Sequence, residues 1–368
     1  DAAFVLSGTA VSYSIGAYDT TLSLIIDPEL IFSTFSGSES DNWGYTATPG
    51  LNGVLYAGSA STEDGYPTTT GAFDVDHNGG PNVGVPSDVT ISKFTSDGNN
   101  LVYSTYLGGE DTDLPHSLIV DDDDHLFLLG TTGSDDFPTT NGAADRSFGG
   151  GQAMSAQNLS FGIPYPNGSD MFVTKFNASG TSLLGSTYLG GSGNDGINNS
   201  QNIRYNYGDE ARGEIMLDEN NEVIIASCTR SDDFPRRGTG YQTSLAGQLD
   251  GVVSKLNSDL TEILWSTYLG GTRDDGCYGV AVSESNELFI CGGTQSLNFP
   301  TTISAFQTGF GGGQADGFIA HLNEDGDDLI SSTYFGSNVY DQMYLIQLDN
   351  QGYPHVFGQT ENTGNHFI

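Results

Sequence analysis

The sequence contains very few basic residues. Lys and Arg together number 10, against 47 Asp and Glu, so the formal net charge at pH 7 is −37. A surface of this charge repels the phosphates of nucleic acids and of anionic membranes, so we expect no nucleic-acid binding. The carboxylates suit either a solvated acidic surface or a set of Ca²⁺ ligands, because Ca²⁺ prefers oxygen ligands. We expect most of them to be solvated.

Cysteine and long apolar runs are also scarce. The three cysteines, Cys228, Cys277 and Cys291, form no C-x-x-C metal cluster, and an odd number cannot pair within the chain. Cys277 and Cys291 could meet across a hairpin, and buried free thiols are the alternative. Because no run of about 18 apolar residues occurs, we expect no membrane insertion.

Linear catalytic motifs are missing as well. The six histidines lie outside an H-E-x-x-H pattern, and neither a G-x-S-x-G motif nor a P-loop occurs. We therefore predict no catalytic residues, and we expect that the chain is not an enzyme. Residues that lie far apart in the sequence can still converge in a folded site, so the lack of a motif lowers this possibility without removing it.

Glycine and aromatic residues are abundant, with 51 Gly, 20 Phe and 18 Tyr, which favours turn-rich β structure. One phrase recurs through the chain, Ser-Thr-Tyr-Leu-Gly-Gly. It stands at 104–109, 186–191 and 266–271, with weaker copies at 33–37 and 332–336. Five copies of one phrase indicate a repeat protein.

Four short strand-like segments accompany each copy. The first ends in Lys or, in the last copy, in His321; the second carries the phrase; the third and fourth are apolar. A Phe-Pro corner such as Phe137-Pro138 follows, and we expect its Phe to pack between units. The copies lie more than about 40 residues apart, and four antiparallel strands at such a period are typical of a β-propeller. We predict an all-β fold, a β-propeller built of four-stranded antiparallel blades with five repeats visible; an incomplete ring is the other arrangement that five units allow.

The repeats divide the chain into two parts. Residues 1–21 are expected to be the end of a preceding β domain or lead-in strands, and residues 22–368 are expected to form the propeller. The predicted units lie near 22–87, 88–169, 170–249, 250–315 and 316–368. Because the last unit stops partway through the pattern, we expect the chain to belong to something longer.

The order of these motifs resembles the bacterial SBBP beta-propeller repeat over roughly residues 22–368. The resemblance rests on Tyr-Ser-Thr-Tyr-Leu-Gly-Gly, then an apolar strand ending in Asp, then the Phe-Pro corner. It implies a large secreted or cell-surface protein, frequent in Bacteroidetes, often exported by type IX secretion and in some cases linked to gliding or adhesion. The family supplies no catalytic residues, and its name implies seven blades where five units are visible here. This chain departs from the pattern at Phe35-Ser36 and at Arg236-Arg237.

An acidic residue follows the phrase at a constant offset, and we examined it as a metal ligand. The candidates are Asp113, Asp195, Asp275 and Asp341, with Asp111 added from the acidic cluster at 110–113. Such an Asp either accepts backbone N–H groups and fixes a turn, or contributes to a Ca²⁺ site. We favour the structural role, because one carboxylate per unit is short of the six to eight oxygens that Ca²⁺ takes. Ca²⁺ is the one cofactor considered.

The sequence leaves three functions open. The first is a non-catalytic module on the bacterial cell exterior, for adhesion or for interaction with a protein, a glycan or the secretion machinery. The second is a carbohydrate-active propeller enzyme whose pocket is built from the long insertions at 141–169 and 192–210. The third is a scaffold or fibre subunit. The direction in which the insertions point separates them, since an enzyme needs them to close on a pocket with convergent polar groups.

Overall fold

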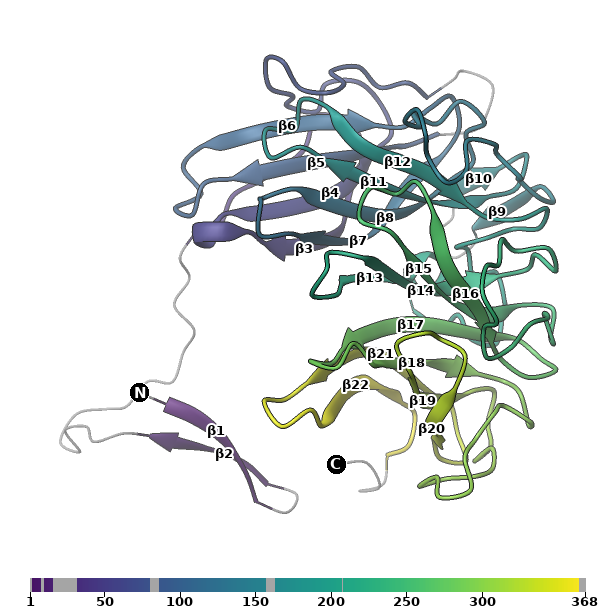
Figure 1. Cartoon of the computed structure of the whole chain (residues 1–368). Coiled ribbons are helices and arrows are strands. Elements are labelled where there is room, and N and C mark those ends of the chain that lie inside the picture. The colour runs from purple at the N-terminus through teal and green to yellow at the C-terminus, as the bar shows by residue number, and fades with distance from the viewer. Residues whose placement is uncertain are drawn as a thin grey trace.

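The chain folds almost entirely into β-strands. The computed structural model describes residues 2–7, 10–15, 32–79, 86–156, 163–206 and 208–363. The described residues between 42 and 360 form four antiparallel sheets of four strands, a sheet of two strands at the C-terminal end of this range, and one further short strand pair (Figure 1). The predicted all-β class and the four-stranded antiparallel sheets are confirmed.

The sheets follow one another in chain order, and we number them accordingly. Sheet 1 contains β3 (Asn42–Pro49), β4 (Leu55–Ser61), β5 (Asp88–Phe94) and β6 (Leu101–Leu107). Sheet 2 contains β7 (Asp113–Val120), β8 (Leu126–Thr132), β11 (Asp170–Phe176) and β12 (Leu183–Leu189). Sheet 3 contains β13 (Glu214–Leu217), β14 (Val223–Thr229), β15 (Asp250–Leu256) and β16 (Ile263–Leu269). Sheet 4 contains β17 (Asp275–Val282), β18 (Leu288–Thr294), β19 (Asp316–Leu322) and β20 (Leu329–Phe335). Sheet 5 contains β21 (Asp341–Leu348) and β22 (Pro354–Thr360).

Smaller elements lie outside these sheets. They are the pair β1 (Ala2–Ser7) and β2 (Ala10–Ile15), the pair β9 (Met154–Ala156) and β10 (Ile163–Tyr165), and the 3-10 turns η1 (Leu51–Gly53) and η2 (Asp209–Ala211). In the part of the chain that the structure describes, no helix has the length and hydrophobicity needed to cross a membrane.

Each of the four-stranded sheets combines strands from two successive sequence units. In sheet 2, β7 and β8 come from the unit near 88–169, and β11 and β12 come from the unit near 170–249. The Phe-Pro corner and the loop after it join the second strand to the third. The sequence units are therefore offset by two strands from the sheets. A periodic sequence gives the period of the repeat, but it does not show at which strand one sheet ends.

The hydrophobic core lies between neighbouring sheets. Strands β5, β8, β11, β14 and β15 are buried along their whole length, because both faces of these sheets are covered. The corner residues Phe137, Phe234 and Phe299 are 3%, 2% and 3% exposed, and each belongs to a cluster that joins two successive sheets. The predicted packing role of the corner is confirmed.

The basic residue at the end of each first segment binds a carboxylate in a strand-connecting turn. Lys255 on β15 lies 2.9 Å from Asp218 and 2.8 Å from Glu222, both beside the turn between β13 and β14. In sheet 4, His321 on β19 lies 3.1 Å from Glu287. In sheets 2 to 4 the basic residue thus ties the third strand to the hairpin formed by the first two strands. In sheet 1, Lys93 on β5 pairs instead with Asp124 in the turn between β7 and β8 of sheet 2.

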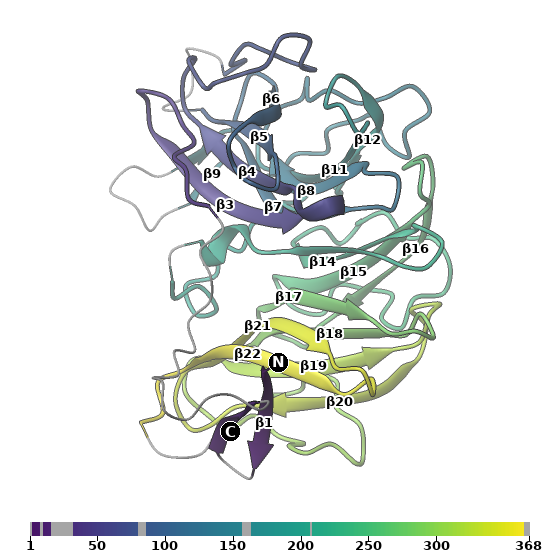
Figure 2. The same ribbon diagram turned by 90° about the vertical axis from the view of Figure 1, so that its left-hand side faces the viewer.

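The first strands of the sheets form the inner edge of the molecule. Strand β7 packs against β3 and β13, and β17 packs against β13 and β21. Figure 2 faces this edge and shows sheets 1 and 2 in the upper half, β14, β15 and β16 of sheet 3 below them, and the strands of sheets 4 and 5 in the lower half. The arrangement is β-propeller-like, and it leaves the polar groups of five different sheets facing one region.

Candidate functional site

The periodic Asp residues predicted as metal ligands fix the loops that follow each phrase. Asp113 accepts the backbone N–H of Gly109 at 2.8 Å and the hydroxyl of Ser134 at 3.1 Å. Asp195 makes the same two contacts with Gly191 and Ser231, at 2.8 and 2.7 Å.

The last two copies follow the same plan. Asp275 accepts from Gly271 and Ser296, and Asp341 accepts from the N–H and the hydroxyl of Ser337. The turn-fixing role that we favoured is what these contacts show.

A second Asp, missed in the sequence, lies beside each of the first. Asp88, Asp170, Asp250 and Asp316 open the third strands of sheets 1 to 4 and are fully or almost fully buried. A Cβ placed on Gly108 would lie 2.6 Å from Asp88 Oδ1 and 2.7 Å from Asp113 Oδ2. The first glycine of the phrase is therefore required by the approach of two carboxyl groups. The signal was present in the sequence, because an Asp begins each of these first segments.

Burial raises the pKa of these paired carboxyl groups. The pKa of Asp88 is raised to about 9 by burial and by the nearby Asp113, whose own pKa is raised to about 7 by burial. For the next pair, burial raises the pKa of Asp170 to about 8 and that of Asp195 to about 7. These two pairs therefore retain protons near neutral pH.

The predicted ligands are not brought together. Each pair lies at a different junction between neighbouring sheets, since Asp88 opens β5 of sheet 1 and Asp113 opens β7 of sheet 2. Asp111 lies apart from the pairs in a loop, where the Asn167 amide donates to it at 3.4 Å. No group of three or more His, Cys, Asp or Glu side chains is placed to hold a metal ion within the described ranges. Calcium binding at these residues stays a prediction.

The three cysteines are free and buried. Cys277 on β17 pairs in register with Gly292, and Cys291 on β18 pairs with Gly279, across a bulge in the ladder. Each of these cysteines therefore faces a glycine on the neighbouring strand, and the two cysteines do not face each other as a disulfide across the hairpin would require. Burial raises the pKa of Cys291 and of Cys277, which makes both thiols unreactive.

The sequence did not predict the cavity that lies on the inner edge of the sheets. This inner cavity has a volume of about 550 Å³, which is within the range of small-molecule sites. Strands β3, β7 and β13 and the residues around η2 line it, together with Tyr278 of β17 and Tyr344 of β21. All five sheets therefore contribute to one site.

The insertion at 192–210 lies across this inner edge. The carbonyl of Ile203 accepts the Tyr278 hydroxyl at 3.0 Å and the Gln342 amide at 2.9 Å. Asn206 donates to the Tyr344 hydroxyl at 2.8 Å. The insertion thus contacts the first strands of sheets 4 and 5, and it reaches the cavity at Gly208.

The insertion at 141–169 reaches the same region from sheet 2. Tyr165 on β10 is fully buried in one cluster with Leu114, Ile197 and Ala211, and Ala211 also lines the inner cavity. Both insertions that the sequence singled out therefore support this site.

Arg212 supplies a positive charge to the cavity and is held from two sides. Its Nε donates to Asp209 Oδ1 at 2.8 Å, and its guanidinium lies 4.3 Å from the ring centre of Tyr344. Asp209 is fully buried and also accepts the backbone N–H groups of Tyr205 and Asn206. A guanidinium fixed in this way is suited to orient a polar ligand.

Glu214 is the acidic side chain that lines the cavity. Ser117 Oγ donates to Glu214 Oε1 at 2.7 Å, which joins β7 to β13. Burial raises the pKa of Glu214, although the Ser117 hydrogen bond opposes that shift. A carboxyl group with a raised pKa keeps its proton closer to neutral pH and can act as a general acid.

His116 is a neutral hydrogen-bonding group beside Glu214. Burial lowers the pKa of His116 to about 3, so its ring is uncharged at neutral pH. Its Nε2 is 2.8 Å from Thr131 Oγ1, and Nδ1 has no hydrogen-bond partner within the described part of the chain. Nδ1 is therefore a buried polar atom without a hydrogen-bond partner among the described residues.

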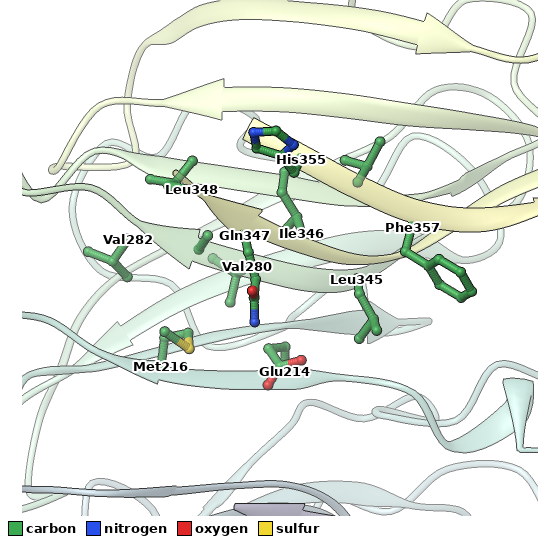
Figure 3. Close-up of a pocket in the computed structure, with 12 residues that line it drawn as sticks. Glu214, Met216, Val280, Val282, Leu345, Ile346, Gln347, Leu348, His355 and Phe357 are labelled. Atoms are coloured by element: carbon green, nitrogen blue, oxygen red, sulfur yellow. The ribbon is translucent and has the colours of Figure 1, made fainter. Parts of the chain in front are cut away.

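A second, more apolar cavity meets the first at Glu214. It has a volume of about 630 Å³ and is lined by Val280, Leu345, Ile346 and Phe357, among others. Figure 3 shows Glu214 and Met216 on one strand, β13, with Leu345 and Gln347 of β21 on the opposite side of this second cavity. Glu214 lines both cavities, so its carboxyl group lies between a more polar space and a more apolar one.

The comparisons with known proteins concern the fold. No family model matches the sequence, and no curated protein matches it. Among solved structures, a NanB sialidase mutant from Streptococcus pneumoniae matches at 9% identity and a TM-score of 0.45, over 96% of this chain and 62% of that one. A GH43_1 enzyme from Xanthomonas citri matches at 10% identity and a TM-score of 0.36, over 86% and 81% of the two chains. A protein of unknown function from Dyadobacter fermentans matches at 10% identity and a TM-score of 0.43, over 86% and 75%.

One expectation from the sequence has to be corrected. We expected that the chain is not an enzyme, and the comparison contradicts this, since the matched structures include a sialidase, a glycosidase-family enzyme, a gluconolactonase and a glucose dehydrogenase. The physical reason for the error is the inner cavity. Its polar groups come from segments that lie far apart in the chain. A search for linear motifs therefore cannot detect them.

Proposed function

We propose that the chain is a carbohydrate-active β-propeller enzyme that cleaves a glycosidic bond in the inner cavity, with Glu214 as the proton donor. The observation that carries the proposal is the placement of a buried, protonatable carboxyl group at the junction of a polar and an apolar cavity. Sugars present many hydroxyl groups and a few apolar faces, so a site for them combines fixed hydrogen-bonding groups with aromatic side chains.

Each side chain then has a distinct role. Arg212 and His116 Nδ1 bind sugar hydroxyls in the polar cavity, and Ser117 orients the Glu214 carboxyl group. The glycosidic C–O bond breaks while the Glu214 proton passes to the leaving oxygen, and water adds its oxygen to the anomeric carbon. The proton that this water releases restores the carboxyl group. The leaving group lies in the apolar cavity, beside Leu345 and Phe357.

The proposal predicts a pH profile. A general acid must be protonated in the reacting enzyme, so kcat/KM falls as the pH rises through the pKa of Glu214. Burial raises this pKa, so the loss occurs at a higher pH than for an exposed glutamate. A kcat/KM that rises with pH over that range would rule out Glu214 as the acid.

The test is hydrolysis of a panel of aryl glycosides that carry an apolar leaving group. Glu214→Gln keeps the shape of the side chain and removes the proton donor, so we expect kcat to fall by about 100-fold or more. Glu219→Gln, on the exposed turn between β13 and β14, is the matched control and should keep wild-type kcat. If the wild-type chain hydrolyses none of the panel, or if Glu214→Gln retains full activity, the proposal fails.

A further inference from the structure

A third cavity lies among the loops that follow β12 and β14, and we call it the loop cavity. It has a volume of about 610 Å³. It is lined by residues 152–154 before and at the start of β9, by residues 192–194 and 199 of the insertion at 192–210, and by residues 230, 232, 245 and 248 between β14 and β15. Its described lining shares no residue with the inner cavity or with the more apolar second cavity, so it is a separate site.

The walls of the loop cavity are held by hydrogen bonds between loops. Asn194 is 5% exposed, and its Nδ2 donates to the carbonyl of Gln152 at 3.1 Å. The backbone N–H of Gly193, after β12 of sheet 2, donates to Ser231 Oγ, after β14 of sheet 3, at 2.8 Å. The protein itself therefore fixes the shape of the cavity, as is usual for a ligand site.

Arg230 is the basic side chain of the loop cavity. Its Nε donates to Asn199 Oδ1 at 2.8 Å, and its Nη1 donates to the carbonyl of Gln248 at 3.1 Å. Its Nη2 has no hydrogen-bond partner among the described residues, and Arg230 is only half-buried. Because the guanidinium is planar and held at two of its nitrogen atoms, the third is presented in a fixed direction and is suited to bind a ligand oxygen.

This arginine departs from the repeat. It follows the last residue of β14, and the residues equivalent to it after β4, β8 and β18 are Thr62, Gly133 and Gln295. Gln295 Nε2 donates to the carbonyl of Gln314 at 3.2 Å, as Arg230 Nη1 does to the carbonyl of Gln248. The contact with the loop carbonyl thus recurs in sheets 3 and 4. The additional guanidinium nitrogen belongs to sheet 3, and the packing of the repeat does not account for it.

The charges of the lining indicate the class of ligand. Asp232 is exposed and is the one acidic residue among the described lining residues, so the cavity has one charge of each sign. The net charge of −37 on the chain disfavours an anionic ligand, and Arg230 disfavours a cation. A hydroxyl group can accept from a guanidinium or donate to a carboxylate. Met154 and Leu245 add apolar contacts, so the lining fits a neutral saccharide.

We propose that the loop cavity is a second, non-catalytic binding site for a neutral saccharide. Arg230 Nη2 donates to one sugar hydroxyl, and Asp232 accepts from another. Met154 and Leu245 contact the C–H groups of the sugar ring. The site lies outside the inner cavity, so binding there does not depend on the catalytic role of Glu214.

The test is nuclear magnetic resonance of the methionine methyl groups in the full chain, which has four Met residues. Met154 lines the loop cavity, Met216 lines the other two cavities, and Met171 is fully buried and lines none of the three. The probes are maltohexaose, cellohexaose and xylohexaose, each added separately. We expect at least one of them to shift the Met154 resonance with a saturable dependence on concentration, while the Met171 resonance stays in place.

Arg230→Gln removes the free guanidinium nitrogen and introduces the residue that sheet 4 has at this position. We therefore expect the fold to be retained and the affinity reported by Met154 to fall by about tenfold or more, the usual loss for hydrogen bonds from a charged group. Arg273→Gln is the matched control, because Arg273 is exposed and lies outside the lining of the loop cavity. This control should bind the probe as the wild type does. An unchanged Met171 resonance shows that each variant is folded.

Four results would overturn the proposal. The first two are that none of the three probes shifts Met154, and that they shift Met216 alone, since the sugar then binds only at the inner edge. The third is an Arg230→Gln chain that binds as tightly as the wild type. Glycine and citrate serve as further probes, and the fourth is a Met154 shift with either of these and with none of the sugars. That result would assign the cavity to a zwitterionic or anionic ligand.

Discussion

The first glycine of each phrase lies against two carboxyl groups, which leave no room for a side chain. Replacing this glycine therefore tests how tightly a single residue is packed. A Cβ on Gly108 would lie within 3 Å of both Asp88 and Asp113, and these side chains are fully buried. We expect Gly108→Ala to destabilise the fold by about 1–3 kcal/mol, the usual cost of overpacking a buried site. Urea unfolding measures this change.

The matched control is Gly309→Ala, at a position where a Cβ would meet no atom within 4 Å and where the backbone is not left-handed. We expect its unfolding free energy to match the wild type within about 0.5 kcal/mol. Equal stability of the Gly108 and Gly309 variants would show that the two carboxyl groups move apart without cost.

At the scale of single elements, the ion pair between a third strand and its neighbouring hairpin is the feature to test. Lys255 is almost fully buried and contacts the carboxylates of Asp218 and Glu222. Lys255→Met keeps the length of the side chain but leaves Asp218 buried without its cation. We expect a loss of about 3–5 kcal/mol in the free energy of unfolding.

An exposed ion pair provides the comparison. Arg237 pairs with Glu262, and their side chains are 64% and 48% exposed. Arg237→Gln should cost no more than about 1 kcal/mol, because water and salt screen such a pair. If the free energy of unfolding falls by the same small amount in both variants, the packing of β15 against the β13–β14 hairpin does not depend on Lys255.

For the whole molecule, the buried Asp pairs predict an unusual dependence of stability on pH. A carboxyl group whose pKa is raised by folding stabilises the folded state below its unfolded pKa, and this contribution is lost as the pH rises through the folded pKa. The raised values run from about 6 for Asp250 to about 9 for Asp88. We therefore expect stability to fall as the pH rises from 6 to 9, as measured by urea unfolding.

Two experiments distinguish the titration of the buried Asp pairs from the repulsion among surface carboxylates: unfolding at high salt, and substitution of a buried Asp. In 1 M NaCl the surface charges are screened, and the buried pairs are screened much less, so most of the pH dependence should remain. Asp88→Asn cannot ionise and should flatten the pH dependence. Stability that rises between pH 6 and pH 9 would contradict the raised pKa values.

Calcium binding is tested on the whole chain by thermal unfolding with Ca²⁺ and with a chelator. An ion that binds only the folded state raises Tm in proportion to its occupancy, so a shift of several degrees would support the prediction. We expect no such shift, because the Asp pairs lie at separate junctions between sheets and already accept hydrogen bonds from the loops that follow each phrase. A clear rise in Tm with Ca²⁺ would show that this expectation is wrong.

The strands and the Phe-Pro corners could be predicted because their signals are local. Apolar runs, turn residues and a repeated Phe are signals that can be read within one or two strands. Phe137, Phe234 and Phe299 are buried, as the packing role predicted for the corner requires. The division into sheets could not be predicted in the same way, since a periodic sequence offers several equivalent starting strands.

The inner cavity depends on contacts between distant segments. Ser117 and Glu214 are 97 residues apart, and no pattern within either segment reveals that they meet. One signal was available: His116 and Glu214 are polar residues within otherwise apolar third segments, which become the innermost strands. Such interruptions are worth examining in a repeat protein, because function tends to reside where the repeats differ.

The sharing of each four-stranded sheet by two sequence units has an evolutionary consequence. Loss of one whole unit, for example from the start of β11 to the residue before β15, removes two strands from one sheet and two from the next, and the remaining halves can pair with each other. A duplication of one whole unit adds strands in the same proportion. The number of sheets can therefore change by one without leaving a half-built sheet between two complete ones.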